Sequence, residues 1–288
     1  MSVNKFGNLA GSCSDDAMQA FTGVGKCGIT EGNTKALVIT ELGMEFAFDK
    51  FANELDAALI AASSAKRAYI LKNVVDNAFE GGDVATAQKG SYGASSPIKL
   101  NAASHAFTID APDCSVQFLM GFNGRKVRVI RVDENNIPFG VKNDNGKFAG
   151  QEANLYVQYT PKAGDTAAAF VLHVYYTDWE ASLKVKSNVA AVTLPDGLVP
   201  LTIVRTAAGK VKLVEACSGY DVTDLYAANI TTAVFVKEDG SNPTAATVAN
   251  GVVSLTPATG NYAVAGADVL NGLHIYGYDG LKTFVKVD

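Results

Sequence analysis

The chain has 288 residues, 24 Lys and Arg against 29 Asp and Glu, and only 18% charged residues. At a usual domain size of about 150 residues, this length predicts two domains, each able to bury a core without disulfide or metal staples. A hydrophobic fraction of 48% excludes an intrinsically disordered protein. A net charge of −5 without a basic run argues against nucleic acid or an anionic membrane as the main partner.

The N-terminal segment, residues 1–33, is rich in Gly, Ser, Asn and Asp and shows little periodicity. We expect an extended arm that either packs against a neighbouring subunit or stays a mobile tail. Residues 1–11 lack the apolar run of a secretory signal peptide, and no stretch reaches the roughly 18 apolar residues that span a bilayer. The expected site of synthesis is therefore the cytoplasm, with no membrane partner.

Residues 34–195 are predicted to form a β-rich domain with one substantial helix. Ala36 to Thr40 is typical of a strand, and residues 44–62 show the spacing of a helix. The apolar stripe of this predicted helix recurs every three or four residues, at Met44, Phe48, Phe51, Leu55, Leu59 and Ala62. Residues 64–78 leave helix and strand as open alternatives.

The polar, glycine-containing segment 80–97 is predicted to be a long interaction loop, because unstructured stretches of this length are unusual in a compact domain. Further strands are expected at Ala106–Ile109, Ser115–Met120, Lys126–Asp133, Gln151–Tyr159 and Ala168–Tyr176. In the third of these, valines alternate with arginines, which indicates one solvent-exposed face.

A domain boundary is expected near 195–196, and residues 196–288 are predicted to be a second domain. Short apolar runs parted by Gly, Asp and Pro indicate a small β-sandwich that is Ig-like in the broad architectural sense. The expected strands are Leu201–Arg205, Lys210–Ala216, Thr232–Lys237, Val248–Thr256, Asn261–Ala265, Leu273–Tyr278 and Lys282–Val287. The fold class is therefore mainly β with one substantial helix (α+β): a β-sandwich-type domain followed by an Ig-like β-sandwich.

No catalytic motif stands out. The segment Gly23–Gly28 resembles a phosphate-binding loop but has Ala20 where a glycine is needed and Cys27 where Ser or Thr is needed. The histidines, His105, His173 and His274, have no second titratable group close by in the sequence. We therefore predict no catalytic residue and no cofactor, and the chain is expected not to be an enzyme.

No metal site is predicted either. Cys13, Cys27, Cys114 and Cys217 lie far apart without a C-x-x-C pair, so we expect four reduced cysteines and no zinc. Two oxygen-rich segments, 133–136 and 143–146, lack the spacing of a calcium loop and are interpreted as turns.

Aromatic side chains gather in the later strands of the first domain, at Tyr156, Tyr159, Tyr175, Tyr176 and Trp179. An exposed set beside Asn, Asp or Gln would suit a carbohydrate. Core packing and subunit contacts explain the same residues equally well.

The layout as a whole resembles structural proteins of tailed bacteriophages. It combines an irregular arm (1–33), a β-rich domain with one helix (44–62) and a long loop (80–97), and a separate Ig-like module (196–288). Tail-tube proteins are the closest in plan, and capsid decoration or head-associated proteins are the near alternative. The resemblance covers the full length but rests on no specific motif, so it assigns no functional residue.

The resemblance implies a non-enzymatic virion protein, made in the host cytoplasm. Its partners would be other copies of itself, in a ring or lattice, and other virion proteins. The low charge is compatible with surfaces that become buried between subunits. Competing classes are a carbohydrate- or surface-binding protein with an Ig-like module and, less favoured, a bacterial adhesion protein.

Overall fold

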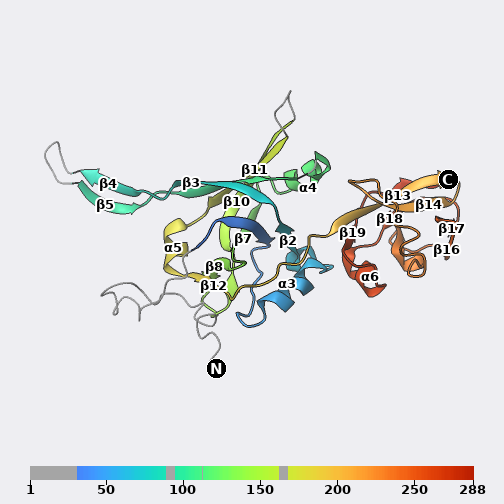
Figure 1. The fold of residues 1–288 in the computed structure, drawn as a ribbon, viewed down its shortest axis with the longest axis horizontal. Coiled ribbons are helices and arrows are strands. Elements are labelled where there is room, and N and C mark those ends of the chain that lie inside the picture. The colour runs from blue at the N-terminus through green and yellow to red at the C-terminus, as the bar shows by residue number, and fades with distance from the viewer. Residues whose placement is uncertain (1–30, 89–94, 112, 162–167) are drawn as a thin grey trace. The chain divides into compact units, whose positions relative to one another are not determined.

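The computed structural model describes residues 31–88, 95–111, 113–161 and 168–288, and the predicted mainly-β fold class is confirmed. The described chain divides into two compact units, each described here by itself (Figure 1). Unit 1 comprises residues 31–58 and 64–195, and unit 2 comprises residues 59–63 and 196–288.

Unit 1 is built on a ten-stranded antiparallel sheet. Its main path runs β12-β8-β7-β10-β11-β6-β3, β1 pairs with both β7 and β2, and β9 pairs with β8. The strands are β1 (Thr34–Thr40), β2 (Ala68–Leu71), β3 (Val74–Gly81), β6 (Ala103–Ile109), β7 (Lys126–Asp133), β8 (Pro138–Lys142), β9 (Phe148–Ala149), β10 (Gln151–Thr160), β11 (Ala169–Tyr176) and β12 (Lys186–Asn188). The open alternative at residues 64–78 is therefore resolved largely as strand.

Strand β7 is the centre of this sheet, and the predicted solvent-exposed face of residues 126–133 is wrong. One edge pairs with β1, while the other pairs with β10 and then with β8. Val129 and Ile130 point to opposite faces, and neither is exposed. Because both faces are covered, Arg131 is buried as well, with 6% exposure.

The predicted helix at 44–62 is confirmed only in its second half, as α3 (Phe51–Leu59). Phe46 instead forms a β-bridge with Phe148, and its ring packs edge-on against Phe51 at 5.1 Å. The Glu54 carboxylate accepts a hydrogen bond from the Ala47 amide at 2.7 Å. Phe46 is thus buried from a loop rather than from a helix, while Met44 and Phe48 are partly buried.

The predicted long loop 80–97 is also wrong, because most of it is β-hairpin. Strands β3 and β6 pair with each other. The same two segments of the chain also contain β4 (Val84–Gln88) and β5 (Ser95–Leu100), which pair with each other as well. Gly81 and Gly82 have φ of +79° and +73°, which turns the chain between β3 and β4 without ending the pairing. Figure 1 shows β4 and β5 extending away from the other strands of unit 1.

Short helices complete unit 1. They are η1 (Ser64–Lys66), η2 (Asp113–Ser115), α4 (Val116–Met120) and α5 (Trp179–Lys184). The strand expected at 115–120 is therefore wrong; its apolar residues lie on a helical turn that buries Leu119 and is followed by the buried Phe122. The main core cluster joins these two side chains to inward-facing residues of β1, β6, β7, β10 and β11.

Unit 2 contains two sheets around one core cluster. The five-stranded sheet has the order β16-β17-β14-β13-β19, with β13 and β19 parallel, and the three-stranded sheet has the order β15-β18-β20. The elements are β13 (Val199–Ala207), β14 (Lys210–Glu215), η3 (Thr232–Val234), β15 (Phe235–Lys237), β16 (Ala245–Ala249), β17 (Val252–Thr256), β18 (Asn261–Val264), α6 (Ala267–Gly272), β19 (Tyr278–Gly280) and β20 (Val285–Lys286). The Ig-like assignment itself stays a prediction.

Four predicted strands of unit 2 differ from the structure. The first half of 232–237 is the helix η3, and only residues 285 and 286 of 282–287 form a strand, β20. Residues 248–256 form the hairpin of β16 and β17 rather than one strand, because Asn250 and Gly251 take positive φ values of 52° and 67° in a tight turn. The strand expected at 273–278 is mostly the turn that follows α6, with His274 at φ 62°.

Candidate functional site

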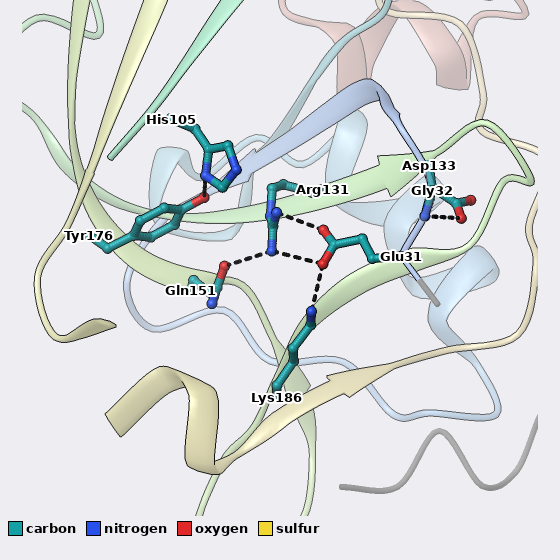
Figure 2. Close-up of polar contacts among 8 residues, drawn as sticks. All are labelled: Glu31, Gly32, His105, Arg131, Asp133, Gln151, Tyr176 and Lys186. Carbon is teal, nitrogen blue, oxygen red and sulfur yellow. Dashed lines mark hydrogen bonds and ion pairs between the residues drawn. The ribbon is translucent and has the colours of Figure 1, made fainter. Parts of the chain in front are cut away.

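A buried polar network lies on the core-facing side of unit 1 (Figure 2). Arg131, on β7, contacts the Glu31 carboxylate through Nη1 at 2.6 Å and Nη2 at 3.3 Å. The other cation is Lys186, on β12, whose Nζ lies 2.6 Å from Glu31 Oε2. Gln151, on β10, adds a 3.5 Å contact to Arg131. One carboxylate thus bridges two cations from different strands.

His105 and Tyr176 form the second part of the network. The His105 Nδ1 and the Tyr176 hydroxyl are joined by a 2.8 Å hydrogen bond between β6 and β11. Burial, followed by the positive charges of Arg131 and Lys186, lowers the pKa of His105 to about 3. Burial also raises the pKa of Tyr176 to about 12. At neutral pH both side chains are uncharged beside an ion cluster.

The side-chain exposures are 7% for Arg131 and 17% for Glu31. Attraction between such buried charges does little more than offset their desolvation, but removing one partner leaves an uncompensated charge. Arg131 Nε and Gln151 Nε2 are buried and make no hydrogen bond within the described residues. The network therefore depends on Glu31 for its charge balance.

The backbone at residues 32 and 33 is fixed to the β7–β8 turn beside the network. The Gly32 amide donates to Asp133 Oδ2 at 3.3 Å, and the Glu134 amide donates to the Asn33 carbonyl at 2.9 Å. A Cβ at Gly32 would lie 3.1 Å from carboxylate oxygens of both Asp133 and Glu134. This close approach explains the small residue next to Glu31.

The chemistry of the network favours a structural role. General base catalysis requires a group whose pKa lies near the working pH, and the pKa of His105 is far below it. Across residues 31–88, 95–111, 113–161 and 168–288, no group of three or more His, Cys, Asp or Glu side chains is arranged to hold a metal ion.

A hollow elsewhere in unit 1 is lined by residues of β1, β3 and the loops beside them. Its two lysines are both engaged with backbone carbonyls: Lys35 Nζ with Glu134 at 3.5 Å and Lys72 Nζ with Leu194 at 3.1 Å. The polar groups of these two lysines therefore do not point at one common position in the hollow, as polar groups do in most ligand sites.

The other two histidines lie in different surroundings. His173, on β11, has its Nε2 3.4 Å from Gln158 Oε1, and His274 Nδ1 lies 2.6 Å from the Tyr276 hydroxyl. The oxygen-rich segments are turns, as predicted: Asp133 Oδ1 accepts from the Ile137 amide at 2.8 Å, and Asn143 Oδ1 accepts from the Lys147 amide at 2.8 Å.

The aromatic side chains divide between the two interpretations offered by the sequence. Tyr176 is buried, and Tyr159 stacks on Phe170 at 4.8 Å. Tyr156 and Tyr175, by contrast, are 50% and 46% exposed, with ring centroids 6.0 Å apart. Core packing therefore explains part of the set and leaves one exposed pair.

The prediction that all four cysteines are reduced is wrong for Cys114 and for Cys217, because each of them takes part in a disulfide bond. Separation along the chain does not measure separation after folding, so the lack of close cysteine pairs was a poor guide. Cys13, Cys27 and the glycine-rich segment Gly23–Gly28 lie outside the described residues, as do residues 1–30 of the predicted arm and residues 89–94 of the predicted loop.

Sequence reasoning missed the network because Glu31 lies 100 residues from Arg131 and 155 from Lys186. One signal was available. Alternation along β7 places Arg131 on the same face as the core residues Val127 and Val129. An arginine in phase with a buried apolar face implies a buried counter-charge.

Comparison with protein-family models gives no match for this chain, and comparison with curated proteins gives none either. No helix within the described residues is both long and apolar enough to cross a bilayer.

Proposed function

We propose that the chain is a non-enzymatic structural protein that self-assembles within a bacteriophage particle, as a component of the tail tube. The observation that carries this proposal is the hairpin from Val74 to Ile109. We call β3 and β6 its proximal half and β4 and β5 its distal half.

The distal half has the properties of an incomplete structure. Among the described residues, β4 and β5 pair only with each other. Val84 and Ile98, one on each strand, are 55% and 65% exposed. An isolated two-stranded hairpin is marginally stable in water, and exposed apolar side chains on it suit a contact with another protein.

The base of the hairpin is braced, which fixes its direction. The ring of Trp179, on α5, lies 5.2 Å from that of Phe79 on β3. The Glu180 carboxylate accepts from the Leu100 amide at 3.5 Å, and a Cβ at Gly82 would lie 3.1 Å from Trp179 Nε1. A hairpin held in one direction can reach a neighbour at lower entropic cost than a free loop.

The sheet of unit 1 supports repeated assembly as well. Its path ends at β12 on one side and at β3 on the other, and in the described chain each end strand pairs with one neighbour. Unpaired strand edges are templates for pairing with another chain. A contact between two different ends, repeated from copy to copy, produces rings or open helical stacks.

The nearest alternative is a capsid decoration or head-associated protein, which would use the same surfaces in a lattice. A second class, a carbohydrate-binding protein, is favoured by the exposed pair Tyr156 and Tyr175, near which His173 contacts Gln158. Aromatic rings beside amide groups are suited to sugars, so loss of glycan binding on replacing both tyrosines with Ala would support that class.

The test is assembly of the full-length protein, measured by light scattering and negative-stain electron microscopy over a concentration series. We expect rings or tubes from the wild type and loss of both in the double variant Val84→Glu/Ile98→Glu. Val204→Glu, on β13 of unit 2, is the matched control, because Val204 is a strand valine with a comparable exposure of 47%.

Closed lattices or caps would favour the capsid alternative over the tube. A protein that stays strictly monomeric at high concentration and forms no particle would overturn the proposal. Assembly that persists in the double variant would show that the distal half of the hairpin is not the contact.

A further inference from the structure

The outer side of the unit 1 sheet is accessible where β10 and β11 pair. In both strands, buried residues alternate with partly or fully exposed ones, so one side faces the core and the other faces away from it. The outward residues form three cross-strand pairs, which are Asn154 with Tyr175, Tyr156 with His173, and Gln158 with Val171. We call these three pairs the outer strip.

Three aromatic rings meet at the centre of the outer strip. The ring centroids of Tyr156 and Tyr175 are 6.0 Å apart, at an interplanar angle of 76°. The rings of His173 and Tyr175 are 6.2 Å apart and nearly parallel, at 17°. Since the two tyrosines are about half exposed, they present two accessible ring surfaces that meet at a steep angle.

Side-chain amides flank these rings at both ends of the strip. Gln158 Oε1 lies 3.4 Å from His173 Nε2 on the neighbouring strand. At the other end, Asn154 is the cross-strand partner of Tyr175. An amide both donates and accepts hydrogen bonds without carrying a charge. The outer strip therefore combines aromatic faces with neutral hydrogen-bonding groups.

We propose that the outer strip binds a neutral oligosaccharide. A sugar ring presents C–H groups on one face and hydroxyl groups around its edge. The electron-rich face of a tyrosine ring attracts such C–H groups, and the flanking amides suit the hydroxyl groups. Because the two tyrosine rings meet at a steep angle, they suit a single unit of a soluble sugar chain better than the flat surface of a crystalline polysaccharide.

The chemistry around the outer strip argues against two other occupants. A nucleic acid requires cations for its phosphates. Lys126 and Arg128, on the adjoining part of β7, are instead paired with Glu152 at 3.1 and 3.6 Å. A protein contact requires a largely apolar centre, and Val171 is the one aliphatic side chain of the strip.

The inference goes beyond the proposed assembly and does not rest on it. The outer strip lies on β10 and β11, whereas the proposed contact between subunits lies on β4 and β5. Sugar binding would thus be an additional property of an assembling protein rather than its whole function. Repetition of the strip from copy to copy would add avidity to a weak single site.

The test is binding of the labelled full-length protein to an array of neutral oligosaccharides of glucose, mannose, galactose and N-acetylglucosamine, with sulfated and sialylated oligosaccharides on the same array. The neutral oligosaccharide with the strongest signal is then titrated by isothermal calorimetry. We expect Tyr156→Ala and Tyr175→Ala each to weaken its binding about tenfold or more, and Tyr156→Phe, which keeps the ring, to retain most of it.

Tyr220→Ala is the matched control, because Tyr220 is an exposed tyrosine of unit 2, at 60%, and its loss should leave binding unchanged. Val84→Glu/Ile98→Glu should also bind the oligosaccharide like the wild type, which separates failure of the strip from failure of assembly. If an alanine variant does not fold, Gln158→Met and Asn154→Leu test the same strip through its amides, and both should weaken binding.

Four results would overturn the sugar site. The array could show no binding to any neutral oligosaccharide, or binding to the charged ones alone. The tyrosine and amide variants could bind the titrated oligosaccharide as tightly as the wild type. Finally, the alanine variants could keep sugar binding but lose assembly, which would make the outer strip a contact between subunits.

Discussion

The two halves of the hairpin are continuous in the chain, but they differ in what stabilises them. The proximal half, β3 with β6, belongs to the ten-stranded sheet and places Phe107 and Ile109 in the core. The distal half, β4 with β5, contributes no residue to that core. The same ladder of backbone hydrogen bonds is thus supported by a buried face in the proximal half, whereas the distal half contacts the rest of unit 1 at its base, where the Leu100 amide donates to Glu180.

This difference suggests different roles for the two halves: the proximal half contributes to the stability of the fold, and the distal half does not. Hydrophobic burial supplies most of the free energy that orders a strand, so a strand without a buried face has no reason to be retained for stability. The distal half is therefore the part of the hairpin for which we propose a contact with a partner. The predictions below test each half and the junction between them, in order of decreasing effect.

Apart from the core substitution Phe107→Ala, which serves below as a contrast, the largest effect is expected from acid acting on the proximal half through His105, on β6. Burial lowers its pKa in the folded state to about 3 from the ordinary value of 6.5, so the unfolded state binds the proton first. This contribution to stability is complete above pH 6.5 and is lost as pH falls toward 3. From pH 7 to pH 4 it should remove about 3 kcal/mol from the free energy of unfolding.

The measurement is urea unfolding of the wild type and of His105→Gln at several pH values. Other acid-titrating groups are common to both proteins, so the difference between the two pH profiles isolates His105. Parallel profiles would show that the environment of His105 does not exclude the proton.

An intermediate effect is expected at the junction of the two halves. Trp179→Ala removes the ring that packs on Phe79 and lies beside Gly82. We expect a loss of about 1 to 2 kcal/mol, since Trp179 is only partly buried, and faster hydrogen exchange at residues 82–83 and 100–101. Leu183→Ala, on the same helix, is the control, and equal exchange in the two variants would argue against a brace.

The sequence predicted the elements whose pattern is governed by burial. The ranges 126–133 and 151–159 match β7 and β10 closely, because a buried strand needs a continuous or alternating apolar run. The distal half of the hairpin has no such run. Its strands are held by backbone pairing, so its polar and glycine-containing sequence was interpreted as a loop.

The candidate site was less accessible to sequence reasoning. An ion pair across 100 residues leaves no local pattern, and only the phase of Arg131 with Val127 and Val129 indicated a buried charge. The helix at 44–50 failed for a related reason. Its apolar spacing suits a helix, but the contact of Phe46 with Phe148 is non-local and overrides that preference.

The smallest effect on stability is expected from removing the distal half altogether. The Asn101 amide donates to the Asp83 carbonyl at 2.8 Å, so the residues on either side of the deleted segment are already paired. Asn-Gly can therefore replace residues 84–100 as a two-residue turn. We expect the free energy of unfolding to change by less than about 1 kcal/mol, because no core contact is lost.

Phe107→Ala, in the proximal half, provides the contrast: it should cost about 3 to 5 kcal/mol, since Phe107 is fully buried. Thermal unfolding compares the two variants directly, and electron microscopy shows whether the truncated protein still assembles. A truncation that destabilises unit 1 as much as Phe107→Ala would mean that the distal half belongs to the fold. A stable truncated protein that no longer assembles would show that this half of the hairpin serves the contact between subunits.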